Sequence, residues 1–242
     1  MKVIKVKNYE ELSRTAATII AGVILSKPDC ILGLATGSSP VGTYDQLAAM
    51  YEEGILDFSH VKSVNLDEYV GLDGSNDQSY RYFMEHNLFS HVDIDPARTH
   101  VPDGACPDAA AACAAYEQSI AEAGGLGLQL LGLGHNGHIG FNEPAPEFPK
   151  ETHCVELTES TINANSRLFD SIDDVPREAY TMGIGTIMAA EEILVVANGS
   201  DKADIVRRAF FGPVTPEVPA SILQFHPNVT VVVDKEAGAL CQ

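Results

Sequence analysis

The chain has 242 residues, of which 45% are hydrophobic and 20% charged, and its net charge is −19 at neutral pH. This length suits one large α/β domain or two small ones, and it allows a substantial core. The negative charge argues against a nucleic-acid partner, because phosphate backbones demand a basic surface. The positions of the few lysines and arginines are therefore informative, since any anion site must collect them.

The N-terminal segment MKVIKVKNYEEL lacks the basic, apolar and small-residue order of a signal peptide. The longest apolar stretch, ATIIAGVIL, is far shorter than a membrane span. The cysteines are widely spaced without a C-x-x-C pair, which is typical of reduced thiols. We therefore expect a cytoplasmic protein with no membrane partner. The cysteines are Cys30, Cys106, Cys113, Cys154 and Cys241.

Short apolar runs alternate with helical patterns along the whole chain. Asn8 is placed to cap the first helix, and Gly124 to end the fourth. The apolar runs predict strands at 2–6, 30–35, 61–66, 128–133, 153–157, 179–185, 192–198 and 229–234. Helices are predicted at 9–26, 41–54, 78–89, 107–125, 159–170 and about 200–211.

This alternation predicts an α/β fold: a Rossmann-like, mostly parallel open sheet with helices on both faces. No linker composition or internal repeat interrupts residues 1–242, so we expect a single domain. In open α/β sheets, ligands bind outside the carboxyl ends of the strands. The loops that follow the predicted strands are therefore the places to look for a site.

The stretch LATGSSP follows the second predicted strand and leads into a helix. Its candidate ligand groups are the backbone and hydroxyls of Thr36, Gly37, Ser38 and Ser39. Free N–H groups at a positive helix end suit a phosphate, although no G-K-[ST] follows as in a Walker A loop. A plain Ser-capped helix explains this stretch alone equally well.

The stretch NLDEYVGL places Asp67 and Glu68 at the carboxyl end of the third predicted strand. One carboxylate there suits a general base, and its like-charged neighbour would raise its pKa toward a useful range. Taken alone, capping of the next turn explains these acids better.

The stretch LLGLGHNGHIGFNEPAP contains G-x-G-x-x-G after a strand, but its prolines oppose the helix that a dinucleotide site needs. His135 and His138 lie three residues apart, yet no further metal-ligand pattern supports a metal site, and we expect none. His138 oriented by Glu143 better fits acid–base work, because an imidazole needs a second group to fix its tautomer.

Two cations are candidates for binding a phosphate: Arg167, in the helix predicted at 159–170, and Lys202, in the first turn after the strand predicted at 192–198. Each alone is better explained as a surface charge. Together, the four stretches combine a phosphate site, a carboxylate base and a histidine acid at one sheet edge. Proton transfer on a sugar phosphate needs these groups and no cofactor.

The motifs NLDEYVGL, GHIGFNEP, ANSR and GSDKA resemble, in this order, those of the glucosamine-6-phosphate deaminases. The resemblance runs from about residue 30 to residue 233. It implies hydrolytic isomerisation of glucosamine 6-phosphate to fructose 6-phosphate with release of ammonia. Asp67 would move a proton between C2 and C1, His138 would open the sugar ring, and Glu143 would orient His138.

The resemblance also implies that the substrate phosphate binds Gly37, Ser38 and Ser39, with Arg167 and Lys202 around it. Many members carry Asp at the position of Asn136, where it helps to hold the histidine ring and its charge. Asn136 is neutral, so Glu143 must stabilise more of a His138 cation here.

Allosteric members bind N-acetylglucosamine 6-phosphate through basic residues after the FNEP motif, where this chain has His153 and Val155. We therefore expect no activation by that ligand. A galactosamine-6-phosphate deaminase, a lactonase and a non-catalytic sugar-phosphate sensor remain alternatives. The sequence does not decide between a monomer and a homo-oligomer.

Overall fold

The computed structural model describes residues 1–166, 169 and 171–241. The strands are β1 (Lys2–Lys5), β2 (Ile31–Leu34), β3 (Lys62–Asn65), β4 (Asp67–Tyr69), β5 (Thr99–His100), β6 (Leu128–Leu131), β7 (His153–Glu156), β8 (Glu178–Thr181), β9 (Glu192–Ala197) and β10 (Val229–Val233). The α-helices are α1 (Tyr9–Ser26), α2 (Ser38–Glu52), α3 (Tyr80–Asn87), α4 (Ala109–Ala123), α5 (Glu159–Asn165), α6 (Ile184–Met188) and α7 (Ala203–Phe211).

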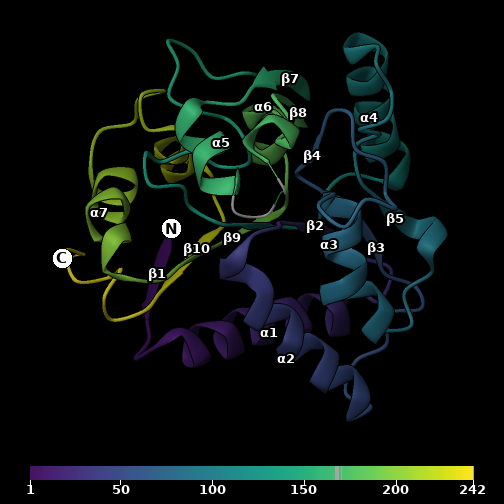
Figure 1. The fold of residues 1–242 in the computed structure, drawn as a ribbon. Helices are drawn as coiled ribbons and strands as arrows, with labels where there is room; N and C mark the ends of the chain where they lie inside the picture. The colour runs from purple at the N-terminus through teal and green to yellow at the C-terminus, as the bar shows by residue number, and fades with distance from the viewer. Residues whose placement is uncertain (167–168, 170, 242) are drawn as a thin grey trace.

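Within these residues, seven strands form one sheet in the order β1-β10-β9-β6-β2-β3-β5. Every pairing in this sheet is parallel. In Figure 1 the sheet is seen nearly edge-on, with α1 and α2 on one side and α5, α6 and α7 on the other. The predicted α/β architecture, a mostly parallel sheet covered on both faces, is confirmed.

The strand order reverses between β2 and β6. From β2 the chain builds outward through β3 to β5, and from β6 it builds the other way through β9 to β10. Loops that leave two such strands diverge and open a crevice at the carboxyl edge. The loops after Leu34 and after Leu131 are therefore the expected place for a ligand site.

A second, smaller sheet was not expected from the sequence. Its strands have the order β4-β8-β7 and pair antiparallel. The prediction that Asp67 and Glu68 end the third strand is wrong in this respect, because β3 ends at Asn65 and both acids belong to β4. Leu66 joins the sheets: its N–H donates to Leu34 O (3.1 Å), and its carbonyl accepts from Met182 N (2.7 Å).

The residues predicted to cap the first helix and to end the fourth do so in the structure. Asn8 Oδ1 accepts a hydrogen bond from Glu11 N at 3.0 Å, which caps α1. Gly124 ends α4 in the left-handed conformation, with a φ of 114°. The predicted 200–211 helix begins with a 3₁₀ turn at Ser200–Lys202 before α7.

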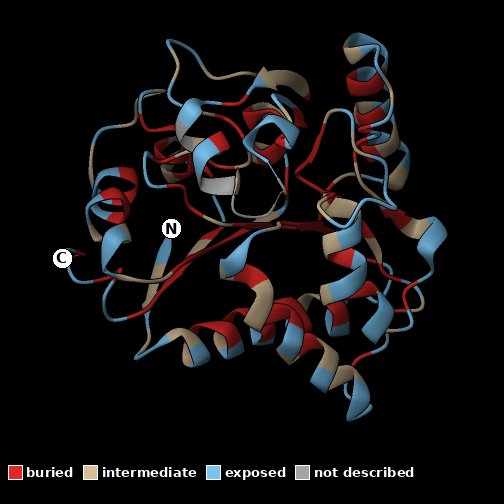
Figure 2. Ribbon diagram, in the orientation of Figure 1, coloured by how far each residue is buried: buried red, intermediate tan, exposed pale blue. Residues whose placement is uncertain are grey.

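The central strands are buried on both faces, as a sheet between two helical layers requires. Strands β2 and β6 are buried at every residue, and Figure 2 shows this burial as red along the sheet and on the inward faces of the helices. Along the residues that the structure describes, no helix has the length and apolar character needed to cross a membrane.

Gly183 and Gly22 provide a matched test of this packing. Gly183 has a φ of −72°, which any residue adopts, but an added Cβ would lie 2.3 Å from Glu151 O. At Gly22, inside α1, an added Cβ has nothing within 4 Å. We predict that Gly183→Ala lowers the free energy of unfolding by about 1–3 kcal/mol because backbone must move.

Gly22→Ala should instead raise the free energy of unfolding by roughly 0.5–1 kcal/mol, because alanine loses less conformational entropy in a helix. Urea denaturation measures both values. Equal effects of the two substitutions would contradict the close approach at Gly183.

Candidate active site

The loop after β6 brings three of the predicted site residues into contact. His138 Nδ1 lies 3.2 Å from Glu143 Oε1. Asn136 Nδ2 donates to the other carboxylate oxygen, Glu143 Oε2. Asn136 Oδ1 in turn accepts from the backbone N–H of His138 at 3.1 Å. His138 and Glu143 are therefore in contact, as the predicted orienting role requires, and Asn136 contacts both residues.

These contacts determine the charge state of Glu143. Burial works to raise its pKa, but the hydrogen bond and positive charge of His138, with the bond from Asn136, outweigh burial and hold the pKa below its ordinary value. Glu143 is therefore a fixed anion that can stabilise a protonated imidazole.

Glycines in this loop make room for the histidine and do not cradle a pyrophosphate. A Cβ at Gly134 would lie 2.3 Å from atoms of the His138 ring. Gly137 has a φ of +91°, which side chains rarely adopt. The pattern therefore marks a tight turn, closed by a hydrogen bond from Gly137 N to Gly134 O at 3.0 Å.

Residues at the end of β8 hold the FNEP loop, residues 141–144, in place. Thr181 Oγ1 accepts from Phe141 N at 3.0 Å. Asn142 Nδ2 donates to Met182 O at 2.9 Å and to Ile139 O at 2.8 Å. Sequence reasoning missed Thr181, because nothing in its local sequence shows that it contacts a loop forty residues earlier in the chain.

Asp67 lies against the same loop. It pairs with Thr181 in the β4–β8 ladder, and a Cβ at Gly140 would lie 3.4 Å from Asp67 Oδ2 and 2.9 Å from Thr181 Oγ1. Only 6% of Asp67 is exposed. Burial, with a smaller contribution from the charge of Glu68, raises the pKa of Asp67 to about 8. A strongly perturbed carboxyl against the loop that carries His138 is a candidate proton-transfer group.

The predicted phosphate stretch forms the start of α2. Gly37 is its N-cap, with a φ of 94° and no side chain to satisfy the first-turn N–H groups. Gly37 and Ser38 are exposed, while Thr36 and Ser39 are partly buried. Ser39 Oγ donates to Asn198 Oδ1 at 3.2 Å. An anion can therefore meet free N–H groups at a positive helix end.

The loop after β9 brings Lys202 to this edge. Asp234 fixes the loop by accepting from Gly199 N at 3.1 Å, and Asp201 accepts from His135 Nε2 at 2.5 Å. Burial lowers the pKa of Lys202, with the charge of Asp201 opposing it. A partly buried ammonium gains from an anionic ligand. The other predicted cation, Arg167, lies outside the described residues.

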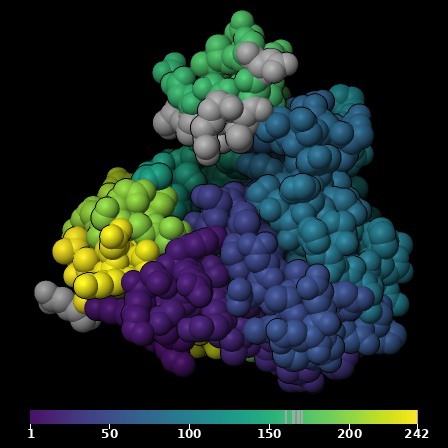
Figure 3. All heavy atoms as spheres, turned by 60° about the horizontal axis from the view of Figure 1, so that its bottom comes forward, coloured from purple at the N-terminus to yellow at the C-terminus, as the bar shows by residue number. Residues whose placement is uncertain are grey.

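The structure thus brings the loops after β9, β6 and β2 to one edge, together with β4. In Figure 3 the segment around α5 (green) projects beyond the body formed by α1 (purple), α2 (blue) and the C-terminal residues (yellow). Within the described part of the chain, no group of three or more His, Cys, Asp or Glu side chains is arranged to hold a metal ion.

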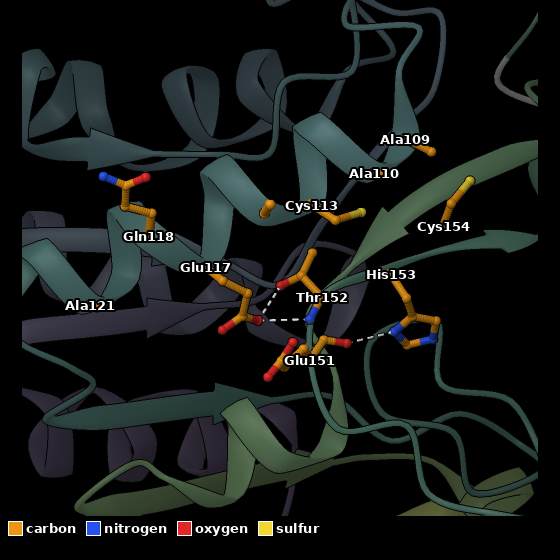
Figure 4. Close-up of a pocket in the computed structure, with 11 residues that line it drawn as sticks. Ala109, Ala110, Cys113, Glu117, Gln118, Ala121, Glu151, Thr152, His153 and Cys154 are labelled. Atoms are coloured by element: carbon orange, nitrogen blue, oxygen red, sulfur yellow. Dashed lines mark hydrogen bonds between the residues drawn. The ribbon is translucent and has the colours of Figure 1, made fainter.

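A cavity of about 750 Å³ lies elsewhere, between α4 and β7. Figure 4 shows Glu117, Glu151, His153 and the thiols of Cys113 and Cys154 along its wall. His153 bonds through Nδ1 to Glu151 O at 2.9 Å. Since carboxylates and thiols repel or ignore an anion, this wall does not suit a phosphate.

The family model for glucosamine-6-phosphate isomerases and 6-phosphogluconolactonases matches residues 6–232 of this chain. The chain belongs to this family. A glucosamine-6-phosphate deaminase of Lachnoclostridium phytofermentans is 57% identical over 232 residues, covering 96% of this chain and 98% of that protein. One of Clostridium perfringens is 54% identical over 240 residues, covering 99% of each chain.

The solved structures agree with this assignment. A monomeric glucosamine-6-phosphate deaminase matches with a TM-score of 0.96 and 47% identity, covering 99% of this chain and 100% of that one. A 6-phosphogluconolactonase from Trypanosoma cruzi matches with a TM-score of 0.81 at 20% identity, over 100% of this chain and 97% of that one. The second likeness shows the shared fold alone.

Asn136 bridges Glu143 and His138 by donating to the Glu143 carboxylate and accepting from His138 N. This Asn136 bridge leads to a prediction about Glu143. In Asn136→Asp, a carboxylate replaces the amide that donates to Glu143, so repulsion replaces a hydrogen bond and the pKa of Glu143 rises. Carbon-13 NMR of glutamate-labelled protein measures this pKa. The matched control is Asn76→Asp, the same change in an exposed loop, which should leave it unchanged. An unaltered Glu143 titration in Asn136→Asp would show that the bridge is not formed.

Proposed function

We propose that this chain deaminates and isomerises glucosamine 6-phosphate to fructose 6-phosphate and ammonia. The observation that carries the proposal is the approach of the buried Asp67 to the loop that holds His138 and Glu143. Family membership and full-length relatives named for this reaction support it.

The chemistry requires two proton-transfer sites. The proton at C2 of an amino sugar is weakly acidic until C1 becomes an open-chain carbonyl, so the ring must open first. His138, oriented by Glu143 and braced by Asn136, transfers the proton at the ring oxygen. Asp67 then moves a proton between C2 and C1 through an enolamine, and water adds to the resulting C2 imine to release ammonia and form the ketose. General acid–base help of this kind contributes roughly 10²–10⁴-fold per group.

The substrate phosphate binds at the start of α2, on the N–H groups and hydroxyls of Thr36, Gly37, Ser38 and Ser39. Lys202 and Arg167 complete the phosphate site. Holding the phosphate remotely from the reacting carbons orients C1 and C2 between the two proton-transfer groups. No cofactor takes part in this scheme.

The alternative functions differ in the role that they give to Asp67. A galactosamine-6-phosphate deaminase would use the same groups on the C4 epimer. A lactonase would leave Asp67 without a C2 proton to take. A non-catalytic sensor would not need the raised pKa of a buried carboxyl. The five cysteines are all free, which supports the proposed cytoplasmic location, where thiols stay reduced.

Turnover tests the proposal directly. We predict stoichiometric ammonia and fructose 6-phosphate from glucosamine 6-phosphate, with galactosamine 6-phosphate converted much more slowly. Asp67→Asn should abolish turnover, because the amide cannot accept the C2 proton. His138→Gln should lower it by roughly 10²–10⁴-fold through loss of ring opening.

Each alternative has its own outcome in this assay. Faster turnover of the galacto epimer would favour the C4-epimer deaminase. Binding of both sugars without turnover would favour the sensor, and hydrolysis of a phosphogluconolactone would favour the lactonase. Full activity in His138→Gln would contradict the role given to His138.

A second prediction concerns regulation. Adding N-acetylglucosamine 6-phosphate should leave the substrate-saturation curve unshifted at low substrate, because His153 and Val155 stand where the resemblance expects cations. The cavity beside His153 also has a wall of carboxylates and thiols. Initial rates with and without this ligand give the answer, and a leftward shift of the curve would refute the expectation.

A further inference from the structure

Glu68 is a buried carboxylate next to the proposed base, and the reaction scheme above does not use it. Only 2% of it is exposed. Its Oε1 accepts from Tyr69 N and from Tyr80 N, each at 2.9 Å. Its Oε2 accepts from Arg81 N at 2.9 Å. All three donors are backbone N–H groups.

Two of these donors are the first two N–H groups of α3, whose N-cap is Ser79. Helix N-termini favour an anion, and hydrogen bonds to a carboxylate favour its charged form. Burial raises the pKa of Glu68, while the three backbone hydrogen bonds oppose that rise. A side chain that is held only by N–H donors has no donor role to fill, which suits a carboxylate and not an amide.

The same bonds fix the position of β4. This strand has only three residues, and successive side chains of a strand point to opposite faces. Glu68 therefore ties one face of β4 to α3, while Asp67 on the other face lies against Gly140 and Thr181. The loop at Gly104 closes over Glu68, since a Cβ there would lie 3.0 Å from Glu68 Cγ and 2.2 Å from Tyr69 O.

We propose, on the basis of the function proposed above, that Glu68 is a positioning residue for Asp67: it clamps β4 to the start of α3 and places a second carboxylate beside the base. Glu68 itself touches no reacting atom. Its role is to hold Asp67 at the FNEP loop and to make its proton harder to lose.

Among the titratable groups around Asp67, Glu68 is the one whose charge shifts the pKa of Asp67. Burial raises the pKa values of Tyr80 on α3 and Tyr116 on α4, so both stay neutral phenols. On β5, burial lowers the pKa of His100, which therefore stays neutral. Arg81 is engaged by Thr99 through Oγ1 at 2.7 Å and through its carbonyl at 3.1 Å.

Three variants separate the effect of the Glu68 charge from the effect of the Glu68 position. Glu68→Gln removes the charge and places an amide donor against backbone donors. Glu68→Asp keeps the charge but shortens the reach to α3. The control is Glu117→Gln, because Glu117 Oε1 also accepts three hydrogen bonds, from Thr152 N, Thr152 Oγ1 and Thr186 Oγ1 at 2.6–2.8 Å, and Glu117 is not among the groups that raise the pKa of Asp67.

The readout is the pH dependence of kcat/KM, which reports groups of the free enzyme. Asp67 works as a base, so activity rises with pH as it loses its proton, around pH 8 in the wild type. In Glu68→Gln the like charge is gone. The acid limb of the profile, which is the pH range over which kcat/KM rises, should therefore move to lower pH by on the order of one unit. In Glu68→Asp the limb should keep its place while kcat falls roughly tenfold or more, because a small misplacement of a catalytic group is costly.

Glu117→Gln should lower the thermal midpoint without moving the acid limb. A limb that stays in place in Glu68→Gln, or that moves equally in Glu117→Gln, would overturn the proposal. If Glu68→Gln does not fold, unchanged kcat in Glu68→Asp would overturn the positioning role.

Carbon-13 NMR of aspartate-labelled protein, with Asp67→Asn to assign the signal, follows the titration of Asp67 without turnover. Failure of this inference is therefore distinguishable from failure of the proposed reaction.

Discussion

The antiparallel pairing of β4 with β8 is the constraint on which the candidate site depends. It places Asp67 beside Thr181, and Thr181 Oγ1 holds the backbone of Phe141 in the loop of His138. One threonine thus links the carboxylate to the histidine loop through a strand and a hydrogen bond. Since buried backbone groups must find partners, this ladder also fixes how far Asp67 stands from the loop. The separation of the two proposed proton-transfer groups therefore depends on β8.

The parallel sheet supplies the rest of the geometry. The carboxyl ends of β9, β6, β2 and β3 lie side by side at one edge, so the loops that carry Lys202, His138 and the start of α2 converge without any direct sequence link. The chain is strongly acidic, yet its N–H groups at α2 and a partly buried ammonium face this edge. Local backbone dipoles, rather than net charge, therefore favour an anion at the proposed phosphate site of an acidic protein.

The sequence was sufficient for what depends on local patterns. Asn8, Gly124 and the apolar periodicity predicted helix ends and the parallel sheet, and the strand ends pointed to loops that the structure brings to one edge. It could not predict the second sheet, because β4 pairs with a strand far along the chain and shows no signal in its three residues. Thr181, Asp234 and the space that Gly134 leaves for His138 were missed for the same reason: each acts on a distant residue through tertiary contact. The N–H bonds to Glu68 belong to this class, since the sequence shows only two adjacent acids.

Asp67 and Glu143 illustrate how one fold shifts the pKa values of two carboxyl groups in opposite directions. Asp67 is buried, has a second carboxylate beside it and has its pKa raised to about 8. Glu143 is held by an imidazole and an amide, and its pKa is lowered. Opposite shifts of two nearby acids separate a group that exchanges protons near neutral pH from one that stays charged. A neutral Asn136 maintains this separation, because it donates to Glu143 with one end and accepts from His138 with the other. A carboxylate at that position could accept but not donate, and would repel the anion that it now orients. The amide therefore lets Glu143 serve alone as the counter-charge of the histidine, while Asp67 remains free to take a proton.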